Sequence, residues 1–222
     1  MEKEQMKRRI AARVAEEIND GDVVNLGIGI PTLVPGFLPP EIEVTFHSEN
    51  GIIDTGSNPT WEEAEPGYIV NAGGIPAAAA KGGSYIDSCT SFGLIRGGHV
   101  DCTVLGALQV DESGGLANWI IPGKKIPGMG GAMDLVAGAK RVIIAMEHTA
   151  KGNLRVLEKC TLPYTAISCV DLIVTNMGVI QVTANGLKLI EYASEYTIAE
   201  IQEATGARLD TSGAVRREVT TV

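Results

Sequence analysis

Glu49 is the residue whose type and position most favour chemistry in this sequence. It follows the alternating apolar and polar residues of Ile42–Gly51 (IEVTFHSENG), a pattern typical of a β-strand. Asn50-Gly51 then predicts a turn, because both residues tolerate positive φ. Ligands of open α/β sheets bind where strands end. Glu49 is therefore either a carboxylate placed for nucleophilic catalysis or a solvated glutamate on a surface turn.

A glycine turn earlier in the chain offers groups that such a carboxylate needs. Val23–Leu26 is predicted to be a buried strand, Gly27 and Gly29 follow it, and Pro31 suits the first turn of a helix. Free N–H groups at a helix N-terminus bind anions and carbonyl oxygens. Gly27 and Gly29 are therefore candidate oxyanion donors, and a tight packing turn is the alternative.

Composition limits the class of protein. The 222 residues are 45% hydrophobic, which suits one domain spanning 1–222. A net charge of −9 without a basic block argues against a nucleic-acid partner. The four cysteines lack metal-binding spacing and are expected to be free thiols, so no metal site is predicted. No apolar run reaches the roughly 18 residues of a membrane span, and the charged N-terminus does not resemble a signal peptide. We expect a cytoplasmic protein that does not bind membranes.

The periodicity of the remaining chain predicts alternating helices and strands. Helices are expected over 3–19, Asp87–Arg96, Met133–Ala139 and from the capping box at Thr197 to Gly206. Strands are expected over Val100–Val110, Leu116–Ile121, Arg141–Met146, Leu172–Thr175, Val179–Thr183 and Leu187–Tyr192, with an Asn185-Gly186 hairpin. This order predicts an α/β fold with an open, mostly parallel sheet flanked by helices and a mixed edge from the later hairpins.

Two segments are expected to lie outside the regular elements. Residues 52–68 are polar and include Trp61 and an acidic group at Glu62, Glu63 and Glu65, so a surface loop, a short helix or a flap beside the site is expected. The tail from Thr211 is polar and is expected to be frayed.

Several stretches resemble one enzyme family in the family's own order. They are NLGIGIPT (Asn25–Thr32), SENG (Ser48–Gly51), NAGG (Asn71–Gly74), LIRGGHVDCTVLGALQV (Leu94–Val110), ANWIIPGKKIPGMGGAM (Ala117–Met133), Glu147-His148 and CTLP (Cys160–Pro163). Together they resemble the β subunit of the 3-oxoacid enzymes among the family I coenzyme A-transferases. The resemblance covers most of residues 8–175.

The resemblance implies a mechanism and a partner. The glutamate of SENG, here Glu49, would carry CoA as a glutamyl thioester with ping-pong kinetics, and the MGG turn makes Gly130 a candidate oxyanion donor. Coenzyme A would be a substrate, with no metal, flavin or nicotinamide cofactor. A separate α subunit would complete the site in a hetero-oligomer. Acyl-CoA and carboxylic acid substrates are implied, with acetoacetate paired with succinyl-, butyryl- or acetyl-CoA.

Further residues are candidates for substrate or CoA binding, namely Asn50, Gly51, Asn71, Gln109 and Gly131. Gln109 has a second interpretation as a buried amide with its own partners. A structural role is favoured over a catalytic one for His148. An acyl-CoA hydrolase using Glu49, a non-catalytic CoA-binding module and a structural subunit are the alternative functions.

Overall fold

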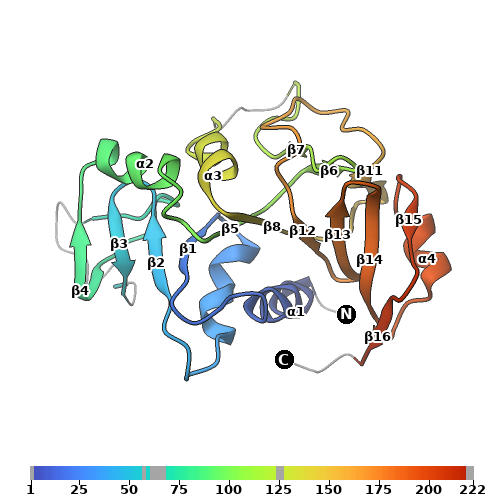
Figure 1. Cartoon of the computed structure of the whole chain (residues 1–222), viewed down its shortest axis with the longest axis horizontal. Helices are drawn as coiled ribbons and strands as arrows, with labels where there is room; N and C mark the ends of the chain where they lie inside the picture. The colour runs from blue at the N-terminus through green and yellow to red at the C-terminus, as the bar shows by residue number, and fades with distance from the viewer. Residues whose placement is uncertain (1–2, 57–58, 61–68, 124–127, 219–222) are drawn as a thin grey trace.

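One mixed β-sheet runs through the part of the chain that the computed structural model describes, residues 3–56, 59–60, 69–123 and 128–218. Five parallel strands form its centre in the order β12-β8-β5-β1-β2, and antiparallel strands extend both edges (Figure 1). The central strands are β12 (Leu172–Val174), β8 (Arg141–Ala145), β5 (Cys102–Leu105), β1 (Val23–Leu26) and β2 (Thr45–Ser48). The predicted open, mostly parallel sheet with a mixed edge is confirmed.

Helices cover both faces of the parallel centre. The helix α1 (Lys3–Ala15) and the 3₁₀-helix η1 (Ile30–Phe37) pack on one face, where Val14, Val34 and Val104 are fully buried. The helices α2 (Ser88–Arg96) and α3 (Ala132–Gly138) cover the other face around Ile95 and Leu135 (Figure 1). The carboxyl ends of β1 and β2 thus lie between two layers of helix, which positions the glycine turn and the Glu49 turn side by side.

Most predicted elements are confirmed, with shorter bounds. The helix expected over 3–19 is α1, which ends at Ala15, and the capping box at Thr197 begins α4 (Ile198–Glu203). The hairpin at Asn185-Gly186 joins β13 (Gly178–Thr183) to β14 (Gly186–Ala193). The prediction of a single strand over Val100–Val110 is wrong, because the chain leaves the main sheet after β5 and begins a second sheet at β6 (Gln109–Asp111). This second sheet has the strand order β11-β6-β7 and also contains β7 (Leu116–Ala117) and β11 (Val156–Leu157). A two-stranded pair, β9 (Thr149–Ala150) and β10 (Asn153–Leu154), completes the connections.

The second mixed edge was not predicted. Residues 52–55, expected to begin a loop or helix, form β3 (Ile52–Thr55), which is antiparallel to β2 and to β4 (Ala79–Tyr85). Strand β4 was not predicted because its glycines are unfavourable in a strand pattern. A β-carbon at Gly83 would lie 2.7 Å from the Asp54 carbonyl oxygen, so only glycine permits the pairing of β4 with β3. The flap expected around Trp61, Glu62, Glu63 and Glu65 lies outside the described residues.

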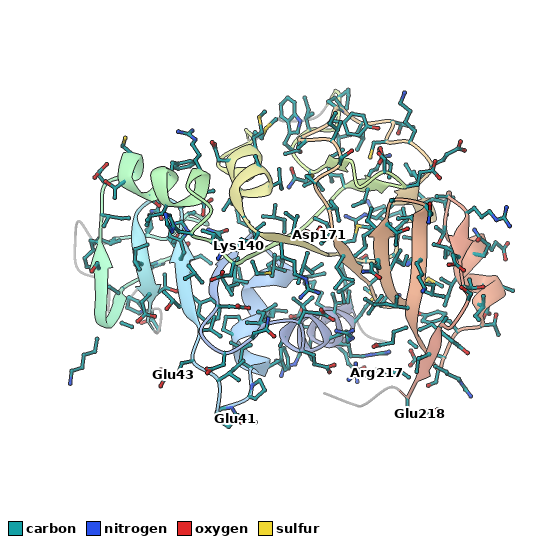
Figure 2. The ribbon with its side chains drawn as sticks, in the orientation of Figure 1. Glu41, Glu43, Lys140, Asp171, Arg217 and Glu218 are labelled. Atoms are coloured by element: carbon teal, nitrogen blue, oxygen red, sulfur yellow. The ribbon has the colours of Figure 1, made fainter. Side chains whose placement is uncertain are left out.

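The C-terminal segment is paired rather than frayed. After β15 (Leu209–Asp210), the strand β16 (Val215–Arg217) runs parallel to β14. The Arg217 guanidinium, labelled in Figure 2, forms ion pairs with Glu16, which directly follows α1, and with Glu191 of β14. These pairs join the two ends of the described chain, so the prediction of a loose tail from Thr211 is wrong up to residue 217.

Candidate active site

Glu49 lies on the tight turn that joins β2 to β3. The Gly51 N–H donates to the Ser48 carbonyl at 2.9 Å and closes the turn, while the Ile86 N–H donates to the Gly51 carbonyl at 3.0 Å. Gly51 has a φ of 128°, and a β-carbon there would overlap the Ile86 carbonyl oxygen. Gly51 is buried and packed on backbone, so it has a structural role in the turn, and binding of substrate by Gly51 stays a prediction.

The two polar neighbours of Glu49 anchor its turn. The Ser48 hydroxyl donates to Asn50 Oδ1 at 2.9 Å and accepts from the Ala72 N–H at 2.9 Å. Asn50 Nδ2 donates to the Val70 carbonyl at 2.7 Å. Asn50 therefore ties the turn to residues 70–72 across the edge of the sheet, and binding of substrate by Asn50 stays a prediction.

Asn25 holds the Glu49 carboxylate, a role that was not predicted from the sequence. Asn25 is on β1, paired in register with His47, and is only 1% exposed. Its Nδ2 donates to Glu49 Oε2 and to the His47 carbonyl, both at 3.1 Å. A polar residue within an otherwise apolar buried strand was the available signal, because such a side chain needs hydrogen-bond partners.

His47 lies beneath this carboxylate and is almost fully buried. Its Nε2 is 2.8 Å from the Ser91 hydroxyl of α2. Burial lowers the pKa of His47 below its usual value, against the opposing field of the Glu49 carboxylate. At neutral pH the imidazole is therefore uncharged, and Glu49 faces a polar but neutral support.

Of the two glycines of the MGG turn, Gly131 contacts Glu49. A β-carbon at Gly131 would lie 3.0 Å from Glu49 Cγ and 3.1 Å from the Phe92 ring, whereas one at Gly130 would meet open space. Gly130 has a φ of 57° and is exposed. The role of Gly130 as an oxyanion donor remains a prediction. At Gly131, by contrast, a side chain would crowd Glu49.

The two glycines after β1 differ in what their N–H groups do. The Gly27 N–H donates to the Val104 carbonyl at 2.8 Å, continuing the pairing of β1 with β5. This hydrogen is already bound within the sheet in the structure without substrate, and the role of Gly27 as an oxyanion donor stays a prediction. Gly29, with a φ of 90°, caps η1 and accepts hydrogen bonds from Thr32 through its carbonyl. Its role as a donor stays a prediction.

Gln109 is bound elsewhere. It begins β6, outside the main sheet, and its Oε1 accepts from the N–H groups of Thr161 and Leu162, both at 2.9 Å. Its Nε2 donates to the Thr161 hydroxyl at 2.9 Å. The half-buried amide thus has partners of its own and holds the CTLP loop in place, and substrate binding by Gln109 stays a prediction.

A pocket of about 440 Å³ opens beside the Glu49 turn on the η1 face. His47 and Ser48 line it together with Ile28 and the loop that contains Asn71. The Asn71 Oδ1 accepts from the N–H groups of Gly73 and Ile75, which shapes that wall. Among the described residues that line the pocket, none is Lys, Arg, Asp or Glu. Asn71 is therefore the predicted binding residue that the structure places at a cavity.

His148 has the structural role that was expected. It is fully buried, with Nδ1 2.9 Å from the Thr175 hydroxyl and Nε2 3.0 Å from the Thr205 hydroxyl. Burial lowers the pKa of His148 to about 4, so the folded protein holds a neutral imidazole through the pH range in which the unfolded chain protonates it. His148 joins β8 to the segment after α4 and does not reach the Glu49 turn.

We expect His148 to make stability depend on pH. Between about pH 6.5 and pH 4 the unfolded chain binds a proton that the folded protein excludes, so the free energy of unfolding falls as pH falls. The slope from this group approaches about 1.4 kcal/mol per pH unit. Urea unfolding at several pH values should show it, with a smaller slope for His148→Gln and an unchanged slope for the exposed His99→Gln. An unchanged slope in His148→Gln would assign the effect to other groups.

Comparison with known proteins identifies the family to which the chain belongs. Residues 7–204 match the family described as Coenzyme A transferase. The chain is 50% identical over 204 residues to a probable coenzyme A transferase subunit beta of Bacillus subtilis, covering 91% of this chain and 94% of the relative. It is 50% identical over 205 residues to the acetate CoA-transferase subunit beta of Escherichia coli, covering 92% and 93%. It is 47% identical over 203 residues to the mitochondrial succinyl-CoA:3-ketoacid coenzyme A transferase 2A of Rattus norvegicus, covering 90% of this chain and 39% of the relative.

The fold matches a solved structure as well. An acyl-CoA transferase (YdiF) from Escherichia coli O157:H7 superposes with a TM-score of 0.72 at 19% identity, covering 97% of this chain and 43% of that chain. The chain belongs to the coenzyme A transferase family. Within that family it corresponds over nearly its whole length to the polypeptides named subunit beta.

The described residues set two further limits. None of their helices is long and apolar enough to cross a bilayer. They also contain no group of three or more His, Cys, Asp or Glu side chains arranged to hold a metal ion.

Proposed function

We propose that this chain is the catalytic β-type subunit of an enzyme that moves coenzyme A between an acyl-CoA and a 3-oxoacid such as acetoacetate, with Glu49 as the nucleophile. The position of Glu49 carries the proposal. Its carboxylate lies at the carboxyl edge of the parallel strands, half-buried, with Oε2 held by Asn25 at 3.1 Å. One carboxylate oxygen is oriented by the protein, and the side chain remains accessible to a thioester.

The proposed chemistry proceeds in two half-reactions. A Glu49 oxygen attacks the thioester carbonyl, the C–S bond breaks, and CoA leaves as a thiolate, which gives an acyl-glutamyl anhydride. The thiolate then attacks the glutamyl carbonyl and expels the carboxylate of the first acid, which leaves Glu49 as its CoA thioester. The acceptor acid reverses both steps and leaves as its CoA ester. Only protein and CoA groups take part, so no metal or redox cofactor is proposed.

Each attack forms a tetrahedral oxyanion that needs hydrogen-bond donors. One such donor contributes several kcal/mol to catalysis in comparable acyl transfers. Gly29 and Gly130 are the favoured candidates in this chain, since the Gly27 N–H is bound to Val104. Both have positive φ and no neighbouring atom where a side chain would extend, which leaves their backbone open to a bound substrate.

A second polypeptide is part of the proposal. The Bacillus subtilis and Escherichia coli relatives are named subunit beta, which supports an α subunit as the partner. The Glu49 turn is half-buried in this chain alone. Water must be excluded from a glutamyl thioester, because hydrolysis would release CoA without transfer. An α subunit covering the turn would supply this exclusion.

The pocket beside the turn supports an uncharged acyl group. Its described walls combine apolar side chains of Leu26, Ile28 and Phe46 with neutral polar groups, and they contain no cation to bind a second carboxylate. Named relatives act on both acetate and succinyl-CoA, so family membership leaves the donor open. We propose acetyl-CoA or butyryl-CoA as the donor in preference to succinyl-CoA.

The test is an assay of the complex of this chain with its α-type partner. With acetoacetate as acceptor, we expect the complex to use acetyl-CoA or butyryl-CoA at least about tenfold more efficiently than succinyl-CoA, a difference of about 1.4 kcal/mol in activation free energy. This chain alone should be inactive. Preference for succinyl-CoA would contradict the donor class, full activity of the isolated chain would contradict the partner, and release of free CoA without acceptor would favour a hydrolase.

A further inference from the structure

Three buried polar side chains form a row beneath Glu49. Thr103 on β5, Asn25 on β1 and His47 on β2 are register partners on adjacent parallel strands, so they share the sheet face that α2 and α3 cover. They are 0%, 1% and 4% exposed. Apolar residues beside them on the three strands pack in the layer of α1 and η1, namely Val24, Leu26, Phe46, Cys102 and Val104. A polar row inside a hydrophobic layer needs internal partners for every polar atom.

The side-chain nitrogens of Asn25 and His47 have hydrogen-bond partners, but two oxygens of the row do not. The two hydrogens of Asn25 Nδ2 go to Glu49 Oε2 and the His47 carbonyl, and the His47 Nε2 meets the Ser91 hydroxyl. Asn25 Oδ1 and Thr103 Oγ1 are the buried side-chain atoms without a hydrogen-bond partner among the described residues. They belong to adjacent residues of the row, and one is an acceptor while the other carries a hydrogen.

We propose that Thr103 is a positioning residue for the transferase reaction: its hydroxyl donates to Asn25 Oδ1, directly or through one shared water molecule, and so fixes which end of the amide faces Glu49. A carboxylate only accepts hydrogen bonds, so Asn25 must present Nδ2 to it. An amide turned by 180° would direct Oδ1 at the carboxylate and repel it. Rotation of the short Thr103 side chain, or one water between strands about 4.8 Å apart, satisfies both oxygens.

Loss of the Thr103 hydroxyl should affect the chemical step of CoA transfer and leave substrate binding unchanged. Thr103 lies one strand away from Asn25 and does not line the described pocket, so it acts through the amide and not on substrate binding. Loss of its hydroxyl leaves Glu49 with a carboxylate that is less well aimed at the thioester. The turnover number should therefore fall while KM stays unchanged.

The inference rests on the proposed role of Glu49, and the test separates the two. In the assembled enzyme, Thr103→Val should lower kcat about tenfold with KM within twofold, and Thr103→Ser, which keeps the hydroxyl, should restore it. Thr45→Val, the same change on β2 at a half-buried side chain, is the matched control and should leave kcat unchanged. Thermal unfolding of each variant reports whether folding is retained.

A double-mutant cycle tests the route through Asn25. In an Asn25→Ala background, Thr103→Val should cause no further loss of kcat, because the amide through which it acts is gone. Wild-type kcat in Thr103→Val, failure of Thr103→Ser to restore it, or additive losses in the double variant would each overturn the inference. If Glu49→Gln also retains transfer, the proposed function fails; if Glu49→Gln is inactive while Thr103→Val is normal, only the role of Thr103 fails.

Discussion

Glu49→Gln should slow CoA transfer by at least about 10⁴-fold in the assembled enzyme, the scale seen when a covalent nucleophile is removed. An amide oxygen does not attack a thioester, yet it still accepts the hydrogen bond from Asn25 at 3.1 Å, so folding should be retained. Glu49→Asp withdraws the carboxylate by one methylene. Misplacement on that scale costs about 10²-fold, so Asp should also be a poor substitute. Steady-state kinetics of the wild type should be ping-pong.

Covalent labelling identifies the nucleophile directly. Incubation of the complex with acyl-CoA and no acceptor should leave CoA on Glu49, and borohydride or hydroxylamine should convert that thioester to an alcohol or a hydroxamate on the peptide containing residues 47–50. Glu43→Gln is the matched control, because Glu43 is exposed just before β2 (Figure 2). A label on another peptide, or transfer retained in Glu49→Gln, would refute the proposed mechanism.

Gly131→Ala should lower kcat by about 10²-fold with a small change in stability. Gly131 has a φ of −82°, which alanine adopts without strain, so the effect comes from crowding alone. The new methyl group would lie 3.0 Å from Glu49 Cγ and 3.1 Å from the Phe92 ring. At least one of these neighbours must shift by a few tenths of an ångström, and a Glu49 carboxylate displaced by that much is poorly aligned with the thioester.

The control for Gly131→Ala is Gly93→Ala. Gly93 follows Phe92 within α2, and a β-carbon there meets open space. This change should leave kcat unchanged and stabilise the helix by up to about 1 kcal/mol. Measurements of kcat and of thermal unfolding separate the two effects. Normal turnover in Gly131→Ala would show that Glu49 does not depend on the space beside Gly131.

The centre of the fold was predictable from local pattern, and the Glu49 edge was not. The strand Val23–Leu26 is continuous and apolar apart from one residue, and Asp87 caps α2 through the Thr90 N–H as its position indicates. By contrast, β4 contains Gly82-Gly83 and has no alternation, so its strand form depends on pairing with β3. Long-range pairing of this kind leaves no local signal.

In the candidate site, too, local features could be predicted from the sequence and long-range contacts could not. Glu49 was found from the strand end, the turn and the SENG motif, all of which are local. The internal partners of Gly27 and Gln109, here Val104 and the CTLP loop, could not be predicted because the sequence does not show which N–H groups and amides pair within the fold. The role of Asn25 was not predicted because its contact joins β1 to the turn after the neighbouring strand β2, 24 positions along the chain.

The closed hairpin that carries Glu49 also determines where motion during turnover can arise. The Gly51 and Ile86 N–H groups are bound within the hairpin and its neighbouring segment, and Gly51 is packed against the Ile86 carbonyl. Amide hydrogens held in this way exchange with solvent when the sheet edge opens, on the slow timescale of sub-global unfolding. Glu49 thus lies on a hydrogen-bonded turn that is already ordered before substrate binds. The approach and departure of substrates, and the rearrangements that admit them, must take place in the surroundings of the turn.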